Sequence, residues 1–282
     1  MPLQANAYDY NYGPASNLYS TDWLMHDNDL DQVEYAFPQI YNLFLQQNVY
    51  GQLQNYKSQT TGTLVRNQIY DMDTNHDWST VFYYGHYNTR SVGLAWPDYS
   101  YGFSEQAPQA QQSPAPSTIW DSTDVYVSHA ATSNHKFVFL WVCNNGNNAG
   151  STNPVRGMPF AWTKQPSLNP NGYDAREYCV ISFYNFSVTL MEGMGTFGDY
   201  GLGGTENIYK FWLVWFYYFA LNGYSIHGAL DQASIICGWS GGWSDPANRL
   251  SQGYNYYYHI TQDYFFGQMC VYGNSYIYLP QD

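Results

Sequence analysis

The sequence is poor in charged residues, and poorest in basic ones. Asp, Glu, Lys and Arg together make up 11% of its 282 residues, about half of the share in an average protein. Nine Lys and Arg stand against 22 Asp and Glu, which gives a formal net charge of −13. Phosphate backbones and anionic lipid surfaces would repel such a chain, so we expect no nucleic-acid partner and no docking on an anionic membrane.

Long apolar runs are also lacking. The most apolar stretch, residues 209–221, has the length of one helix in a protein core, whereas a helix that spans a bilayer needs about 20 apolar residues. We therefore expect a soluble globular protein with no membrane insertion.

Cysteines are few and widely spaced, at positions 143, 179, 237 and 270. The absence of a C-x-x-C pair excludes the common structural zinc sites. In an oxidising compartment, one disulfide among Cys179, Cys237 and Cys270 is an option, with Cys143 outside it as a free thiol.

Aromatic residues are abundant, at 20% of the chain with 31 Tyr, and a hydrophobic content of 45% excludes wholesale disorder. With so few charges, hydration of the surface must come from neutral polar groups, which keep it at any pH. This composition is typical of secreted and cell-surface proteins, so we expect an extracellular or cell-surface location.

Hydrophobic patterns predict alternating strands and helices. We predict strands at residues 7–12, 52–56, 79–84, 136–142 and 178–184, helices at 29–47 (with Pro38 as a kink or a late start), 60–70, 121–133, 207–221 and 225–237, and edge strands after 254. The predicted domain spans residues 1–240, with a loop-like Pro- and Gln-rich insertion at 88–118 and an aromatic-rich extension, 241–282, packed on the same domain. This order favours an α/β fold with a mostly parallel sheet and helices on both faces.

Two of the predicted buried strands each end beside a chemically reactive residue. Residues 79–84 lead into Gly85 and His86, and residues 136–142 lead into Cys143. Sites in parallel sheets form at the carboxyl ends of strands, so we expect His86 and Cys143 to lie together at one edge of the sheet. A histidine within reach of a cysteine can supply the base for a thiol nucleophile.

These features resemble the caspase–gingipain–clostripain clan of cysteine peptidases. His86 precedes Cys143 by 57 residues, and caspases place their histidine about 50 residues before the cysteine. Cys143-Asn144-Asn145-Gly146 is similar to the Cys-x-Asn-Gly form of gingipains. The predicted helix at 29–47 and the helical pair within 211–233 stand where the clan places its first large helix and a late helical pair. The resemblance covers roughly residues 5–240 and implies a three-layer caspase-like fold.

The resemblance also implies an activity, that of a cysteine endopeptidase on protein or peptide substrates with no required cofactor. The Cys143 thiolate would attack the peptide carbonyl, and His86 would protonate the leaving amine. The backbone amides of Cys143 and of Gly85 or Tyr87 would stabilise the oxyanion, by about 3 kcal/mol per donor. Clan members usually carry Gly after the histidine and often Ala before the cysteine. Tyr87 and Val142 depart from that pattern, which bears on activity more than on fold.

An acidic turn precedes the strand that leads to His86. Its oxygen-bearing side chains alternate, at Asp71, Asp73, Asn75 and Asp77, as they do in calcium loops. It lacks the central glycine and the last carboxylate of an EF-hand, so an acidic turn is the preferred interpretation. A calcium site stays open as the alternative, because clostripain-like and gingipain-like enzymes depend on calcium.

Other functions stay open beside the peptidase. A Tyr-rich, charge-poor surface favours packing against copies of itself, so the chain could be a structural cell-surface, filament or coat subunit built on an inactive caspase-like fold. A third option is a carbohydrate-binding module. Trp239, Trp243 and the tyrosines at 254, 256, 257 and 258 suit either sugar stacking or packing, and packing is preferred.

Overall fold

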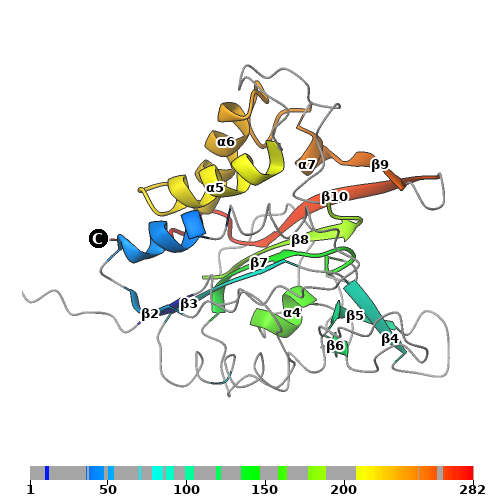
Figure 1. The fold of residues 1–282 in the computed structure, drawn as a ribbon, viewed down its shortest axis with the longest axis horizontal. Helices are drawn as coiled ribbons and strands as arrows, with labels where there is room; N and C mark the ends of the chain where they lie inside the picture. The colour runs from blue at the N-terminus through cyan, green and yellow to red at the C-terminus, as the bar shows by residue number, and fades with distance from the viewer. Residues whose placement is uncertain are drawn as a thin grey trace, which may run out of the picture.

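The chain forms an α/β structure around a mixed seven-stranded sheet with the order β2-β1-β3-β7-β8-β10-β9 (Figure 1). The computed structural model describes residues 10–12, 36, 38–47, 50–53, 70, 78–84, 87–91, 99–104, 119–121, 135–146, 158–163, 177–188, 208–246, 248–258 and 263–281.

The strands of this sheet are β1 (Tyr10–Tyr12), β2 (Tyr50–Leu53), β3 (Ser79–Tyr84), β7 (His135–Trp141), β8 (Cys179–Asn185), β9 (Tyr254–Tyr258) and β10 (Asp263–Gly273). From β2 to β8, neighbouring strands run parallel, whereas β10 is antiparallel to both β8 and β9. The prediction of a mostly parallel sheet is therefore confirmed for its core. Each of the five predicted strands overlaps an observed one, and β2 begins two residues earlier than predicted, at Tyr50. Residues 7–9 and 54–56 of the predictions lie outside the described part of the chain.

A second, three-stranded antiparallel sheet contains β4 (Tyr87–Ser91), β5 (Tyr99–Ser104) and β6 (Ile119–Asp121). The prediction of a loop-like insertion at 88–118 is therefore wrong for residues 88–91 and 99–104. The four prolines of this segment lie between its strands, and the strand residues themselves are rich in Tyr, Ser and Thr. Asp121 ends β6 rather than beginning a helix, and the rest of the predicted helix lies outside the described residues.

Helices cover the large sheet. The helical residues 38–45, α5 (Ile208–Ala220) and α6 (Ile226–Ile236) lie on one side of it, and α4 (Met158–Thr163) lies on the other (Figure 1). The helix predictions for 207–221 and 225–237 are confirmed to within one residue at each end. Ala36 is helical as well, so Pro38 lies within the helix, and the remaining residues of the predicted helix before Pro38 lie outside the described part of the chain. Of the predicted helix at 60–70, only Tyr70 is described, and it is helical.

The start of α6 is fixed by a side-chain cap. The Ser225 hydroxyl accepts a hydrogen bond from the Gly228 amide at 3.1 Å, while Ser225 itself keeps an extended backbone. A capping serine satisfies one of the amides that the first turn of a helix leaves without a partner. The short helices α4 and α7 (Arg249–Gln252) were not predicted, because six and four residues are too few for a helical period to stand out.

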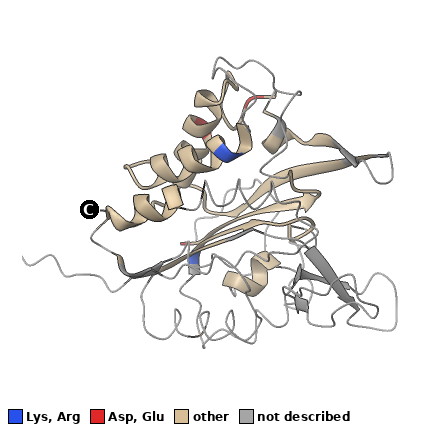
Figure 2. Cartoon of the chain, in the orientation of Figure 1, with Lys and Arg blue, Asp and Glu red and all other residues tan. Residues whose placement is uncertain are grey.

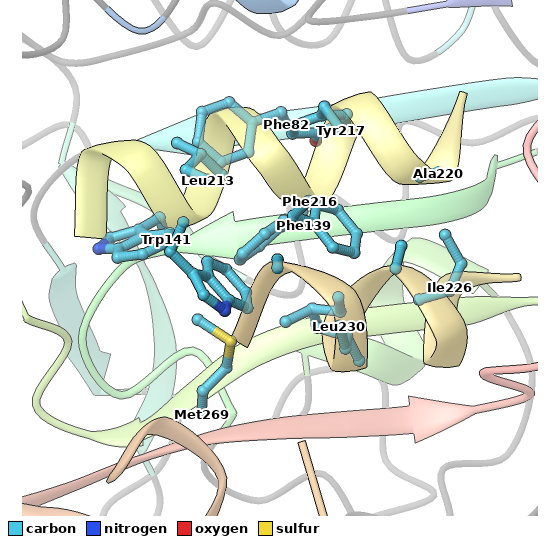
Figure 3. Close-up of a cluster of buried hydrophobic side chains, with 14 of the residues drawn as sticks. Phe82, Phe139, Trp141, Leu213, Phe216, Tyr217, Ala220, Ile226, Leu230 and Met269 are labelled. Atoms are coloured by element: carbon cyan, nitrogen blue, oxygen red, sulfur yellow. The ribbon is translucent and has the colours of Figure 1, made fainter. Parts of the chain in front are cut away.

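The core lies between the sheet and α5, and it is largely aromatic (Figure 3). Phe139 packs its ring 5.6 Å from that of Phe216 and 6.4 Å from that of Trp212. Phe82 of the neighbouring strand packs against Tyr217 at 5.8 Å. Alternate residues of β7, such as Val138 and Leu140, are fully buried as well. Both faces of the central strands are thus covered, which explains why the strands appear in the sequence as continuous apolar runs.

The C-terminal strands belong to the same sheet as the rest. β10 lies inside the sheet, because it pairs with β8 on one side and with β9 on the other, and β9 forms the edge. The prediction of edge strands in this region is confirmed for β9 only. Among the described residues, no helix combines the length and the apolar character that crossing a bilayer requires.

Candidate functional site

Three neighbouring parallel strands, β3, β7 and β8, end at one edge of the large sheet. β3 and β7 are in register up to their last residues, with Tyr84 opposite Trp141. β7 and β8 pair through Phe139 and Ile181, with both strands continuing in the same direction. Two residues beyond β7 lies Cys143, and two residues beyond β8 lies Ser187. The carboxyl edge of the parallel sheet is therefore where the predicted nucleophile stands.

Cys143 begins a tight turn that is tied to the end of β8. The Asn144 amide donates to the Asn185 carbonyl at 2.5 Å, and the Gly146 amide donates to the Phe183 carbonyl at 2.8 Å. Asn144 and Asn185 both have a left-handed backbone, with φ of 61° and 58°, a conformation that asparagine tolerates better than most residues. The turn therefore has a fixed position relative to the sheet.

The interior of the turn is closed by Asn145 and Gly146. The fully buried Asn145 side chain donates from Nδ2 to the Cys143 carbonyl at 3.0 Å. The Gly146 carbonyl accepts from the Tyr272 hydroxyl at 2.8 Å, so β10 also holds the turn. A Cβ atom on Gly146 would lie 2.9 Å from Phe183 backbone atoms and from the Tyr272 hydroxyl oxygen. Glycine is thus required here for close packing.

The Cys143 sulfur is half-buried and contacts Ser187. The Ser187 amide donates to Cys143 Sγ at 3.3 Å, and the Ser187 hydroxyl oxygen lies 3.3 Å from the same sulfur. Sequence analysis missed this residue. A usable signal existed, because Ser187 follows its strand by the same two positions as Cys143 follows β7, but the pairing of the two strands was needed to see it.

The other three cysteines differ from Cys143 in environment. All three are buried in the folded chain, and desolvation raises the pKa of the Cys237 thiol to about 12 and that of Cys270 to about 11. Burial raises the pKa of Cys179 further still. A buried thiol is a poor nucleophile because the thiolate is the reactive form. Cys143 is therefore the cysteine best placed to react.

The disulfide that the sequence allowed is absent from the structure, in which all four cysteines are thiols. The sheet register explains this for one pair, because Cys270 lies opposite Ser182 and Cys179 opposite Gly273. The two cysteines are thus offset by three residues along adjacent strands, about 10 Å at the rise of a strand. A disulfide needs Cα atoms within about 7 Å of each other.

Several predicted site residues lie outside the described part of the chain. These are His86 and Gly85, together with the proposed calcium ligands Asp71, Asp73, Asn75 and Asp77. Tyr87, the other predicted oxyanion donor, is the first residue of β4 and pairs with Phe103 in the small sheet. Within the described residues, no cluster of His, Cys, Asp or Glu is arranged to hold a metal ion.

The tryptophans that could have served as sugar platforms are inside the molecule. Trp239 and Trp243 are 4% and 5% exposed, and both belong to the hydrophobic core. Trp243 packs 6.3 Å from Trp212 of α5, and Trp239 lies at the same distance from Tyr209. The preferred interpretation of these two residues as packing groups is confirmed.

Charged residues are sparse in the described part of the molecule (Figure 2). Tyrosine hydroxyls take part in fixing the site instead. Besides Tyr272, Tyr254 of β9 donates from its hydroxyl to the Phe186 carbonyl, one residue before Ser187. The indole nitrogen of Trp141 donates to the Val188 carbonyl at 2.6 Å, one residue after it. Neutral donors therefore anchor both flanks of Ser187.

No protein-family model matches the chain, and comparisons with curated proteins and with solved structures each found no match.

Proposed function

We propose that this protein is a cysteine endopeptidase of the caspase-like type, with Cys143 as the nucleophile and His86 as the general acid and base. The proposal includes a three-layer caspase-like fold, a protein or peptide substrate, and an extracellular or cell-surface location. No cofactor is required by this chemistry, and residues 71–77 are the candidate calcium site.

One observation carries the proposal: β3 and β7 are adjacent parallel strands, and Tyr84 lies opposite Trp141. His86 follows Tyr84 by two residues, as Cys143 follows Trp141. Neighbouring strands lie about 4.8 Å apart, so a register that continued for two residues would bring an imidazole within reach of the Cys143 sulfur. Two residue types that form a catalytic pair thus follow adjacent strands at equal distances from their ends.

The chemistry follows from this pair. The Cys143 thiolate attacks the carbonyl carbon of a peptide bond, and the imidazolium of His86 gives its proton to the leaving amine. Water then releases the acyl group, with His86 accepting the proton of that water. Backbone amides at the ends of the strands, those of Cys143 and of Gly85 or Tyr87, stabilise the developing oxyanion.

A digest of a diverse peptide library, read by mass spectrometry, tests the proposal. We expect cleavage by the unmodified chain and a loss of at least about 1,000-fold in both Cys143→Ala and His86→Ala. His227→Ala is the matched control, because His227 lies on α6, pairs with Asp231 at 3.5 Å and stacks on Tyr276. It should keep full activity. Cleavage that persists in Cys143→Ala, or is absent from the folded parent chain with and without calcium, would refute the proposal.

A second candidate, a structural subunit of a filament or coat, is favoured by the β9–β10 hairpin. β9 is an edge strand of sequence YNYYY, without the lysine or proline that blocks edge pairing. On β10, Tyr264 and Phe266 are 71% and 42% exposed. Self-association through this hairpin would appear as long assemblies in negative-stain images, and a monomer at high concentration would exclude it.

A further inference from the structure

Ser187 makes two contacts with the sulfur of Cys143, and they come from different parts of the residue. The backbone amide donates at 3.3 Å, and the hydroxyl oxygen lies at 3.3 Å. An amide can only donate, so the sulfur is the acceptor in that bond. The hydroxyl can rotate, and against a thiolate it must donate as well. Both groups can therefore bind the deprotonated sulfur at once.

We propose that Ser187 is a positioning residue of the site, which holds the Cys143 sulfur as a thiolate through its amide and its hydroxyl. Hydrogen bonds to a charged group favour that form of the group. They also favour one orientation of the Cys143 side chain, in which the sulfur lies beside Ser187, just beyond the ends of β7 and β8. The role of the sulfur as a peptidase nucleophile is the proposed function, and this inference deepens it without requiring it.

The surroundings show that Ser187 is held in place for this task. The carbonyl before it, that of Phe186, accepts from the Tyr254 hydroxyl, and the carbonyl after it, that of Val188, accepts from Trp141 Nε1 at 2.6 Å. Trp141 is itself fully buried in the core. A donor whose backbone is fixed on both sides does not have to reorganise when charge forms on its partner.

Other titratable groups could also act on this sulfur, and they must be separated from Ser187. His86 follows β3, Tyr184 is on β8, Tyr254 is on β9, and Tyr272 is on β10. The hydroxyls of Tyr254 and Tyr272 each donate to a backbone carbonyl. His86 is therefore the group whose effect most needs a separate variant.

The test measures the rate of Cys143 alkylation by iodoacetamide against pH, with modified peptides quantified by mass spectrometry. The full-length parent chain is compared with Ser187→Ala and Ser187→Thr, all produced in a host without N-glycosylation, because Asn185-Phe186-Ser187 is also a sequon. We expect Ser187→Ala to move the midpoint of the profile up by about one pH unit, a loss of about tenfold in rate at neutral pH. Ser187→Thr keeps a hydroxyl and should restore most of the rate.

His86→Ala provides an arm that does not alter Ser187. In this variant, Cys143 should still react several-fold faster at neutral pH than the cysteine of a free peptide with the sequence of residues 139–148. An alkylation profile of Ser187→Ala that coincides with the parent profile would overturn the inference, as would a His86→Ala variant that reacts no faster than the free peptide. If the profiles shift as expected while no variant cleaves peptides, the role of Ser187 stands and the peptidase proposal fails.

Discussion

Replacing Gly146 by alanine should destabilise the fold by a predictable amount. The added Cβ atom would lie 2.9 Å from the carbonyl carbon and oxygen of Phe183 and from the Tyr272 hydroxyl oxygen. Ordinary contacts of a Cβ atom begin near 3.4 Å, so at least about half an ångström must be gained. The Phe183 atoms are backbone in the interior of the sheet, so the Cys143 turn, rather than the strand, must move.

The magnitude follows from the contacts that this movement disturbs. Overpacking of a well-packed interior costs about 1–3 kcal/mol. The Gly146 amide and carbonyl also have hydrogen bonds of 2.8 Å to Phe183 and Tyr272, and weakening a buried bond adds about 1 kcal/mol. We expect a total near 3 kcal/mol. For a chain of this length, that lowers the melting temperature by roughly 6 °C.

A double-mutant cycle tests the cause. Tyr272→Phe removes one of the clashing atoms, so Gly146→Ala should cost about 1 kcal/mol less in that background than in the parent chain. The control is Gly228→Ala, a helical position of α6 where the nearest atom is 3.3 Å away on the Tyr224 side chain. Alanine should be neutral or stabilising there. Thermal and urea denaturation give all four values, and a cost below about 0.5 kcal/mol for Gly146→Ala would contradict the packing argument.

The cysteines and Trp141 can be tested in the same chain. At pH 8, a thiol of pKa about 11, such as Cys270, is ionised to about one part in a thousand, whereas an ordinary exposed thiol is ionised to about a quarter. Iodoacetamide should therefore modify Cys143 at least about 100-fold faster than any other cysteine, and peptide mass spectrometry measures these rates. Burial raises the pKa values of Cys270 and Cys237, so the contribution of these thiols to stability should be fully present below about pH 8.5 and be lost as pH rises toward 11 and 12, where the unfolded chain holds fewer protons. The slope is about 1.4 kcal/mol per pH unit and per thiol, and Cys270→Ser should reduce it in urea titrations. Trp141→Phe removes the donor to the Val188 carbonyl and should cost about 2 kcal/mol while slowing Cys143 alkylation, whereas an unchanged alkylation rate would show that Ser187 is held by other contacts.

The central strands could be predicted from the sequence because their environment leaves a local signal. β3, β7 and β8 are buried, so each is a run of β-branched and aromatic residues. The helices α5 and α6 were predicted for a similar reason, since Asn222-Gly223 separates two apolar stretches of helical length. β4 and β5 were missed because the prolines around them dominated the composition of the segment.

The site could be predicted only in part, because several of its contacts depend on which strands pair with each other in the sheet. Cys143 was found from its place after a buried strand. Ser187 lies 44 residues away in the sequence, and its contact with Cys143 exists only through the pairing of β7 with β8. The hydroxyl of Tyr272 reaches Gly146 across 126 residues, from a strand whose neighbour could not be deduced from local pattern.

This last bond has a consequence for the chain while it is being made. A ribosome synthesises Gly146 first and Tyr272 126 residues later. Until β10 emerges and inserts beside β8, the carbonyl of Gly146 lacks its donor, and the Cys143 turn is held to the sheet by its two backbone bonds to β8 alone. The Cys143 turn thus reaches its full set of hydrogen bonds only late in translation, once the strand that carries Tyr272 has joined the sheet.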